Sequence, residues 1–366
     1  MQVELVHMAV FDVGSELELD RVATVLGQAP VRAPLVARSP LPTYAGILSP
    51  LETVIETTVE VTRPDGSVYT VAGRVESRVH AVGVVAIRLR TMVEHEGIDG
   101  LGRLAAGLRI DGRPFISAAE AWMASIRPEL AAARVEPYEV HVPPEPYLVF
   151  AIPGSGAEPT RLLEQEQGPL TALLMGDPSG SRISTRLIDH VLRAPLQYDV
   201  DDLVLVGPEA TVVVSPREPY EDVLDVLEFA NLELLELRTY DAYLDRRLDL
   251  ALPTLSRLQR PGGVFRSARG VLTELSETRL DFARLTENLR DTGKLFGDWY
   301  LGRLHRIASE RFHLEEWARA VTAKMQTLND ILHLAEEAVD HRRAVILESM
   351  IVLLFVLDLV LIFMVA

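Results

Sequence analysis

The chain has 366 residues, of which 36 are basic and 53 acidic, so its formal net charge is −17. A strongly acidic chain is not expected to present the extended basic face that binds nucleic acid non-specifically. The sequence has no cysteine, which excludes disulfides, thiolate nucleophiles and cysteine-ligated metal centres. This length allows two or three domains, or one domain plus an elongated arm.

Residues 1–215 predict an α+β body rich in strands. Alternating segments at 53–62 and 67–75 flank Arg63-Pro64-Asp65-Gly66, a turn-forming run, and therefore predict a β-hairpin. The pattern predicts further strands at 3–13, 80–92, 138–152, 203–206 and 211–214. It predicts short helices at 17–26, 98–108, 117–133, 159–175 and 181–192.

Residues 216–343 predict a long helical arm. Apolar residues repeat at helical spacing over 223–251, with Asp241 at one of these positions, and again over 267–307. A heptad seam then includes Val321, Met325, Leu328, Leu332, Ala335 and Val339. Two interpretations remain open, packing within one three-helix bundle and self-association between copies. Acidic residues of the arm are expected on solvated helix faces, namely Glu228, Glu233, Glu236, Asp245 and Asp249.

The segment 344–366 predicts a single C-terminal transmembrane helix. Its 23 residues would form a helix of roughly 35 Å, which exceeds a hydrocarbon core of about 30 Å. A helix that is apolar on every side has no face suited to water. The protein is therefore expected to be tail-anchored in a bacterial inner (cytoplasmic) membrane. Arg342 and Arg343 directly precede the span, which predicts a cytoplasmic N-terminal body.

Two acids interrupt this apolar segment. Glu348 lies near its start, where a solvated position at the headgroups and a functional role are equally open. Asp358 lies near its middle, where a charge costs about 2.5–3.5 kcal/mol on insertion scales. Asp358 is therefore expected to be protonated or to bond a partner helix in an oligomer.

Motifs for catalysis, cofactors or metals are not found. Gly154-Ser155-Gly156 lacks the remaining residues of a phosphate-binding loop, so a plain connection is expected there. The nine histidines show no metal-ligand spacing, and the sequence has no HExxH or GxSxG motif. We therefore expect no catalytic, cofactor-binding or metal-binding residues.

The C-terminal half resembles the required-for-meiotic-nuclear-division family, a sporulation and mitochondrial inner-membrane family. The tail from Arg343 to Asp358 resembles its closing signature, with acids at Glu348 and Asp358. The residues Glu236, Arg238, Tyr240 and Asp241 look like its central helix, and Glu310, Arg311, Phe312 and Trp317 like the segment before its last heptad helix. The likeness covers residues 200–366 and indicates a distant bacterial branch. It implies a membrane-anchored, self-associating protein without accepted enzymatic activity, whose mitochondrial relatives support translation of membrane subunits.

These observations predict a tail-anchored, self-associating membrane scaffold or assembly factor. Its expected partners are the lipid bilayer, further copies of the chain and an unknown protein bound by the body. The alternative is a membrane-tethered enzyme or ligand sensor with a site in the α+β body. A pocket lined by converging titratable residues would favour that alternative.

Overall fold

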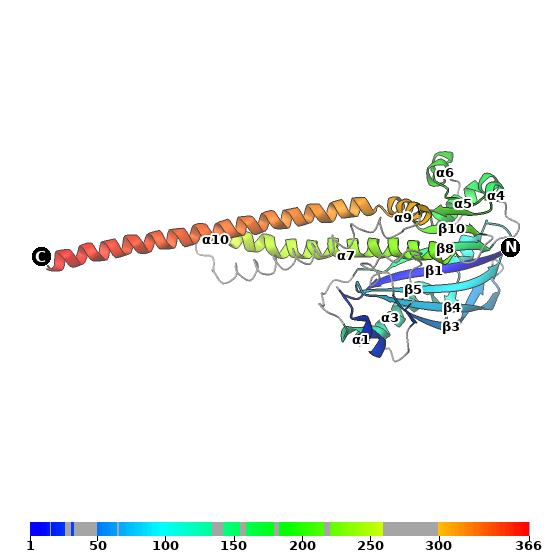
Figure 1. Cartoon of the computed structure of the whole chain (residues 1–366), viewed down its shortest axis with the longest axis horizontal. Helices are drawn as coiled ribbons and strands as arrows, with labels where there is room; N and C mark the ends of the chain where they lie inside the picture. Colours follow the sequence, from blue (N-terminus) through cyan, green and yellow to red (C-terminus); the bar gives the residue numbers. More distant parts are fainter. Residues whose placement is uncertain are drawn as a thin grey trace. The chain divides into compact units, whose positions relative to one another are not determined.

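The computed structural model describes residues 1–14, 16–25, 31–32, 50–63, 66–133, 142–153, 159–178, 183–215, 220–258 and 299–365 (Figure 1). The chain divides into two compact units. The first contains Met1–Thr239 and Asp291–Glu316, and the second contains Tyr240–Arg290 and Trp317–Ala366.

A ten-stranded mixed sheet forms the centre of the first unit. Nine strands follow the order β7-β6-β3-β4-β5-β1-β8-β10-β9, and β2 pairs with β3 off this path. Figure 1 shows β3, β4, β5, β1, β8 and β10 side by side in this order. The β8–β10 pair is parallel, whereas the other pairs of named strands are antiparallel. The strands are β1 (Gln2–Asp12), β2 (Val31–Arg32), β3 (Leu51–Thr62), β4 (Val68–His80), β5 (Val84–Glu94), β6 (Arg109–Ile110), β7 (Arg113–Pro114), β8 (Glu145–Pro153), β9 (Leu203–Val206) and β10 (Ala210–Ser215).

The predicted hairpin is confirmed as β3 and β4. Their register runs from Leu51 opposite Val79 to Thr62 opposite Val68. At the turn, the Arg63 N–H donates to the Ser67 carbonyl at 2.8 Å. Gly66 has φ +85°, a left-handed conformation that glycine adopts without steric cost. Alternating β-branched residues thus predicted both strands, and the turn residues predicted their connection.

One face of the sheet is covered by short helices. The helix α3 (Phe115–Ala131) buries Phe115, Ala119, Met123, Ile126 and Leu130, which recur every three or four residues. They share a core with alternate residues of β1, including Val3, Leu5 and Ala9. The other helices of this region are α1 (Leu19–Val25), α2 (Leu101–Ala106), α4 (Pro159–Gln165), α5 (Gln167–Leu174) and α6 (Thr185–Val191).

The opposite face of the sheet packs against the long helix α7 (Glu221–Leu258). Leu232 and Leu235 of α7 form a small core with Val10, Val84 and Ala86 from β1 and β5. Because side chains alternate along a strand, the even-numbered residues of β1 around Val10 point toward α7. The first unit also contains α9 (Trp299–Arg311).

The second unit pairs the later part of α7 with the helix α10 (Leu314–Val365). Lys324 of α10 lies 2.7 Å from Asp241 Oδ1 and 2.6 Å from Asp245 Oδ1 of α7. The seam residues Val321, Met325, Leu328 and Leu332 are buried in this single chain, as is Leu244 of α7. The side chains of the remaining seam residues, Ala335 and Val339, lie outside the described set. Whether copies also associate through this seam stays a prediction.

The α+β class and the order of a strand-rich body followed by long helices are confirmed. Most of the predicted helix over 267–307 lies outside the described residues, and α9 accounts for its end.

The predicted transmembrane helix over 344–366 is not confirmed. Among the residues that the structure describes, no helix combines the length and hydropathy needed to cross a bilayer. Helix α10 runs through this segment, and the acids Glu348 and Asp358 lie within it. The side chains at 342, 343, 359, 362, 363, 365 and 366 are outside the description.

Candidate functional site

A buried ionic network joins the sheet to α7. Asp225 Oδ1 lies 2.5 Å from Arg78 Nη1 and 2.8 Å from Arg88 Nη2. Glu228 Oε2 lies 2.6 Å from Arg88 Nε, and its Oε1 lies 3.2 Å from Arg78 Nη1. His80 Nε2 is 3.0 Å from Glu228 Oε1. Two strands therefore contribute three nitrogen-bearing side chains that face two carboxylates on one helix.

The local pattern explains why these groups meet. Arg78 and His80 are two residues apart on β4, so they point to the same face of the sheet. The register places Arg78 opposite Ala86 and Glu76 opposite Arg88. On α7, Asp225 and Glu228 are three residues apart and thus share one face of the helix.

The network is almost fully removed from water. The side chains of Arg78, Arg88 and Glu228 are 3%, 2% and 1% exposed. Burial alone would raise the pKa of Glu228, but the charges of Arg78 and Arg88 and the hydrogen bond from His80 hold it far below its ordinary value. Burial lowers the pKa of Arg78, yet the two carboxylates outweigh this effect and raise it. Two guanidinium groups thus balance two carboxylates, as a buried set of charges requires.

A less buried set of ions continues from this network. Arg90 on β5 lies 2.9 Å from Glu4 Oε1, pairs with Glu221 of α7, and is 3.6 Å from Glu76 Oε1. Burial raises the pKa of Glu76, while the positive charges of Arg90 and Arg88 oppose that change. Charged contacts therefore follow α7 from Glu221 onward.

Two further pairs join α7 to α9 and to β8. Glu233 Oε2 lies 2.7 Å from His305 Nε2 of α9. Arg238 pairs with Glu145 of β8. Burial raises the pKa of Glu145, and the positive charge of Arg238 offsets only part of that rise. All these contacts pair a side chain of α7 with a side chain of the sheet or of α9, so they hold α7 in place.

The expectation that the acids of the arm are solvated is wrong for Glu228, Glu233 and Glu236, which are 1%, 5% and 4% exposed. The groups that pair with Glu228 and Glu233 come from strands and from α9, so the sequence around these two acids does not show them. Asp245 and Asp249 are exposed as expected.

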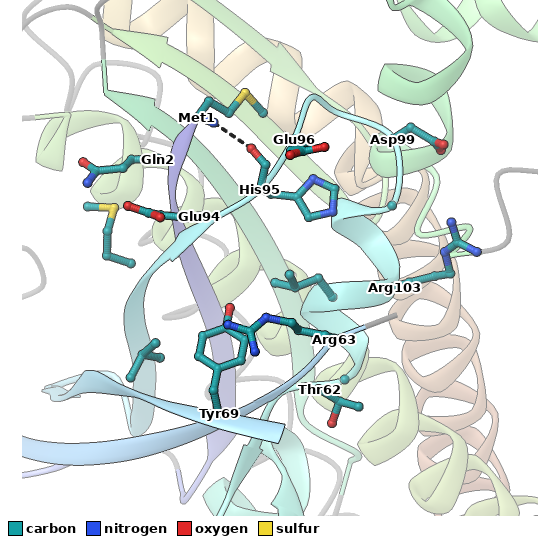
Figure 2. Close-up of a pocket in the computed structure, with 15 residues that line it drawn as sticks. Met1, Gln2, Thr62, Arg63, Tyr69, Glu94, His95, Glu96, Asp99 and Arg103 are labelled. Atoms are coloured by element: carbon teal, nitrogen blue, oxygen red, sulfur yellow. Dashed lines mark hydrogen bonds between the residues drawn. The ribbon is translucent and has the colours of Figure 1, made fainter. Parts of the chain in front are cut away.

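A groove of about 1300 Å³ lies at the end of the sheet where β1 starts (Figure 2). The Met1 amino group donates to the His95 carbonyl at 2.6 Å, and Arg63 stacks over the Tyr69 ring at 4.1 Å. Figure 2 shows Glu94 on one side of the groove, with Asp99 and Arg103 on the other. The charged groups are thus spread around the groove and do not meet at one reacting atom.

Among the described residues, no three or more His, Asp or Glu side chains gather into a group that could hold a metal ion. The intramembrane acids predicted from sequence, Glu348 and Asp358, are both exposed on α10. Arg342 and Arg343, predicted to set the topology, have side chains outside the described set.

The residues of the apparent family motif have separate structural roles. Glu236 of α7 is buried, Arg238 pairs with Glu145, and Asp241 binds Lys324. The Arg311 guanidinium donates to the Val191 carbonyl at 2.7 Å, and Phe312 packs edge-on against Tyr147 at 5.1 Å. Tyr240 and Trp317 are half-buried, whereas Glu310 is exposed. The structure does not bring these residues together into one site.

Comparison with known proteins identifies a different relationship from the one expected. An uncharacterised protein from Methanocaldococcus jannaschii, MJ0711, is 22% identical over 205 residues, which is 56% of this chain. The match covers 62% of that relative, so the chain spans less than two thirds of its length. No solved structure matches the chain.

The resemblance to the required-for-meiotic-nuclear-division family is therefore wrong. It depended on short helical motifs in residues 200–366, where heptads and charged helix faces produce similar strings in unrelated proteins. The family model that matches covers residues 2–221, which is the sheet-containing half. The chain belongs to the family described as uncharacterized protein MJ0711, N-terminal domain.

Proposed function

We propose that the protein is a membrane-anchored scaffold whose α+β body binds a partner and whose C-terminal apolar segment enters a lipid bilayer. The exposed surface at the end of α10 carries this proposal. Every described large apolar side chain from Val345 to Met364 is at least 45% exposed, and Met364 reaches 81%. An apolar surface of this extent on all sides of a helix is unfavourable in water and marks a lipid or protein contact.

A bilayer explains this surface better than a second helix does. A partner helix covers one stripe of a helix, whereas lipid covers the whole circumference. The side chains at 359, 362, 363 and 365 of α10 lie outside the described set in which no membrane-spanning helix is found. The pair Arg342 and Arg343 supports a cytoplasmic body at the cytoplasmic membrane.

Self-association is part of the same proposal. Asp358 is exposed within the apolar segment, where a carboxyl group needs a hydrogen-bonding partner. A second copy of α10 would supply one, since polar side chains bond across helices inside bilayers.

A scaffold also fits the chemistry of the body. The acids Asp225, Glu228 and Glu233 are bound to Arg or His side chains, so they hold elements together and are not poised to act on a substrate. The unknown protein partner would therefore bind the outer surface of the body.

Vesicle flotation tests the proposal with the full chain. The double variant Leu353→Lys and Leu357→Lys places two charges in the apolar segment, at a cost on the order of 5 kcal/mol in the bilayer centre. We expect wild type to float with vesicles of neutral and anionic lipid. The fraction of the variant that floats with the vesicles should be at least tenfold smaller. The matched control replaces Leu250 and Leu252, exposed leucines of α7, with lysine and should float like wild type. Wild type that remains free of vesicles as a water-soluble oligomer would contradict the proposal.

The groove of Figure 2 favours a second candidate, a membrane-tethered ligand sensor or enzyme. Its titratable lining residues, including Arg63, His95 and Arg103, offer both positive and negative contacts. A screen of small metabolites by thermal shift tests this candidate, with Arg103→Ala expected to remove any shift that the groove produces. A shift that survives this substitution would place the ligand elsewhere.

A further inference from the structure

Helix α7 carries two deeply buried glutamates with opposite surroundings. Glu228 is 1% exposed and lies among Arg78, Arg88 and His80. Glu236, two turns later, is 4% exposed, and its Oε1 has no hydrogen-bond partner among the described residues. The same side chain on the same helix is therefore neutralised by cations in one place and left without them in the other.

The charged group that acts on Glu236 is another acid, Asp12 at the end of β1. Val10 of β1 packs against Leu232 and Leu235 of α7. Asp12 lies two residues beyond Val10 on the same face of the strand, and Glu236 follows Leu235 directly. Asp12 is only 8% exposed, so both carboxyl groups lie in the interface between β1 and α7.

The nearby cations have other partners. Arg238 of α7 binds Glu145 of β8, and His305 of α9 binds Glu233. Arg127 of α3 donates to the main-chain carbonyl of Asp12 at 3.0 Å, so this contact does not use the carboxylate.

The neighbouring hydroxyl on α7 does not supply a charge to Glu236 either. The Gly14 N–H donates to Asp12 Oδ1 at 3.2 Å. The Thr239 hydroxyl, one turn from Glu236, is buried and has no partner within the described residues. An isolated ionised carboxylate in such a place is too costly to maintain, and it takes up a proton instead.

We propose that Glu236 carries a proton in the folded body and that its ionisation loosens the last turn of α7 that belongs to the first unit. The docking of α7 on β1 then depends on pH. Thr239 is the last residue of α7 assigned to this unit, so the affected turn is the one at which the helix leaves the body. The proposal is independent of the membrane scaffold proposed above, because it concerns the interior of the body alone.

The direction of the pH effect follows from proton linkage. Burial, and secondarily the charge of Asp12, raises the pKa of Glu236 well above its ordinary value of 4.5. The folded state thus keeps a proton that the unfolded state has released. Stability is complete below about pH 4.5 and falls as the pH rises toward the folded-state pKa of this group.

The test compares Glu236→Gln with wild type by urea unfolding of the full chain in mild detergent between pH 5 and 9. Glutamine mimics a protonated glutamate, so the variant should fold. We expect the ratio of unfolding constants, wild type over variant, to rise by up to tenfold for each pH unit until the folded-state pKa is reached. Hydrogen exchange of the 232–239 segment, corrected for intrinsic rates, should accelerate with pH in wild type more than in Glu236→Gln.

Glu228→Gln is the matched control. Glu228 is ionised in both states above pH 5, so this variant should be less stable than wild type by a factor that does not change with pH. Asp12→Asn should reduce the pH dependence without removing it, because burial is the larger cause. A pH-independent ratio for Glu236→Gln, or a loss of stability like that of Glu228→Gln, would overturn the proposal.

Discussion

Replacing Arg88 with Met tests how strongly the buried network holds α7 to the sheet. The guanidinium is 2% exposed and contacts Asp225 Oδ1 at 2.8 Å and Glu228 Oε2 at 2.6 Å. Methionine keeps much of the aliphatic volume but removes the charge. Among the described residues, Arg78 would then be the one guanidinium left beside the two buried carboxylates, together with His80.

Breaking a buried ion pair by removing one partner costs about 3–5 kcal/mol, since the remaining charge is left uncompensated. We expect Arg88→Met to lower the free energy of unfolding by that amount at pH 7. The same substitution should raise the pKa of Glu228, which then accepts a proton on acidification. The difference from wild type should therefore shrink as the pH falls toward 4.

Urea unfolding followed by circular dichroism, on the full chain in mild detergent at pH 7 and pH 4, measures both effects. Arg74→Met is the matched control on β4, because Arg74 is 48% exposed and pairs with Glu76 at 3.1 Å. An ion pair of this kind contributes at most about 1 kcal/mol. If Arg88→Met costs no more than Arg74→Met at pH 7, the network does not stabilise the attachment of α7 as argued.

The methyl group added in Gly207→Ala would lie 2.4 Å from the Leu174 carbonyl oxygen. We therefore expect this variant to lower the free energy of unfolding, measured by thermal unfolding, by about 1–3 kcal/mol. Gly168 of α5 has open space around it, so Gly168→Ala should instead raise the free energy of unfolding by about 0.5–1 kcal/mol. Equal effects of the two substitutions would contradict the close packing of Gly207 against Leu174. Burial lowers the pKa of His7 to about 4 against the opposing hydrogen bond to the Ala105 carbonyl, so the folded state resists protonation. The free energy of unfolding of wild type should therefore fall by about 2 kcal/mol as the pH falls from 6.5 to 4. This is less than the full pKa shift implies, because His7 is partly exposed. In an acid titration, His7→Gln should lack this loss of stability.

Much of the body could be predicted from local sequence because its elements have regular patterns. The β3–β4 hairpin follows from alternating β-branched residues around a turn that contains Gly66. The helix α3 follows from apolar residues at three- and four-residue spacing. The place of β1 between β5 and β8 could not be predicted, since no local pattern specifies pairing between residues as distant as Leu5 and Phe150.

The ionic network could not be predicted because its partners are equally distant. Arg78 and Asp225 are 147 residues apart, and Arg88 and Asp225 are 137 residues apart. Each acid of α7 resembles a solvated residue when the helix is considered alone. A signal was nevertheless present, since Arg78 and Arg88 adjoin apolar strand residues such as Val79 and Leu89, and a cation buried with them requires a nearby anion.

The central place of β1 has a consequence for synthesis on the ribosome. Residues 2–12 pair on one side with 84–94 and on the other with 145–153. At about 5–20 residues per second, roughly 7–28 s separate translation of the end of β1 from translation of the end of β8. During that interval the nascent chain presents an unpaired, apolar strand edge, which is a template for aggregation. The MJ0711-type body therefore depends on protection of its first eleven-residue strand until β8 emerges.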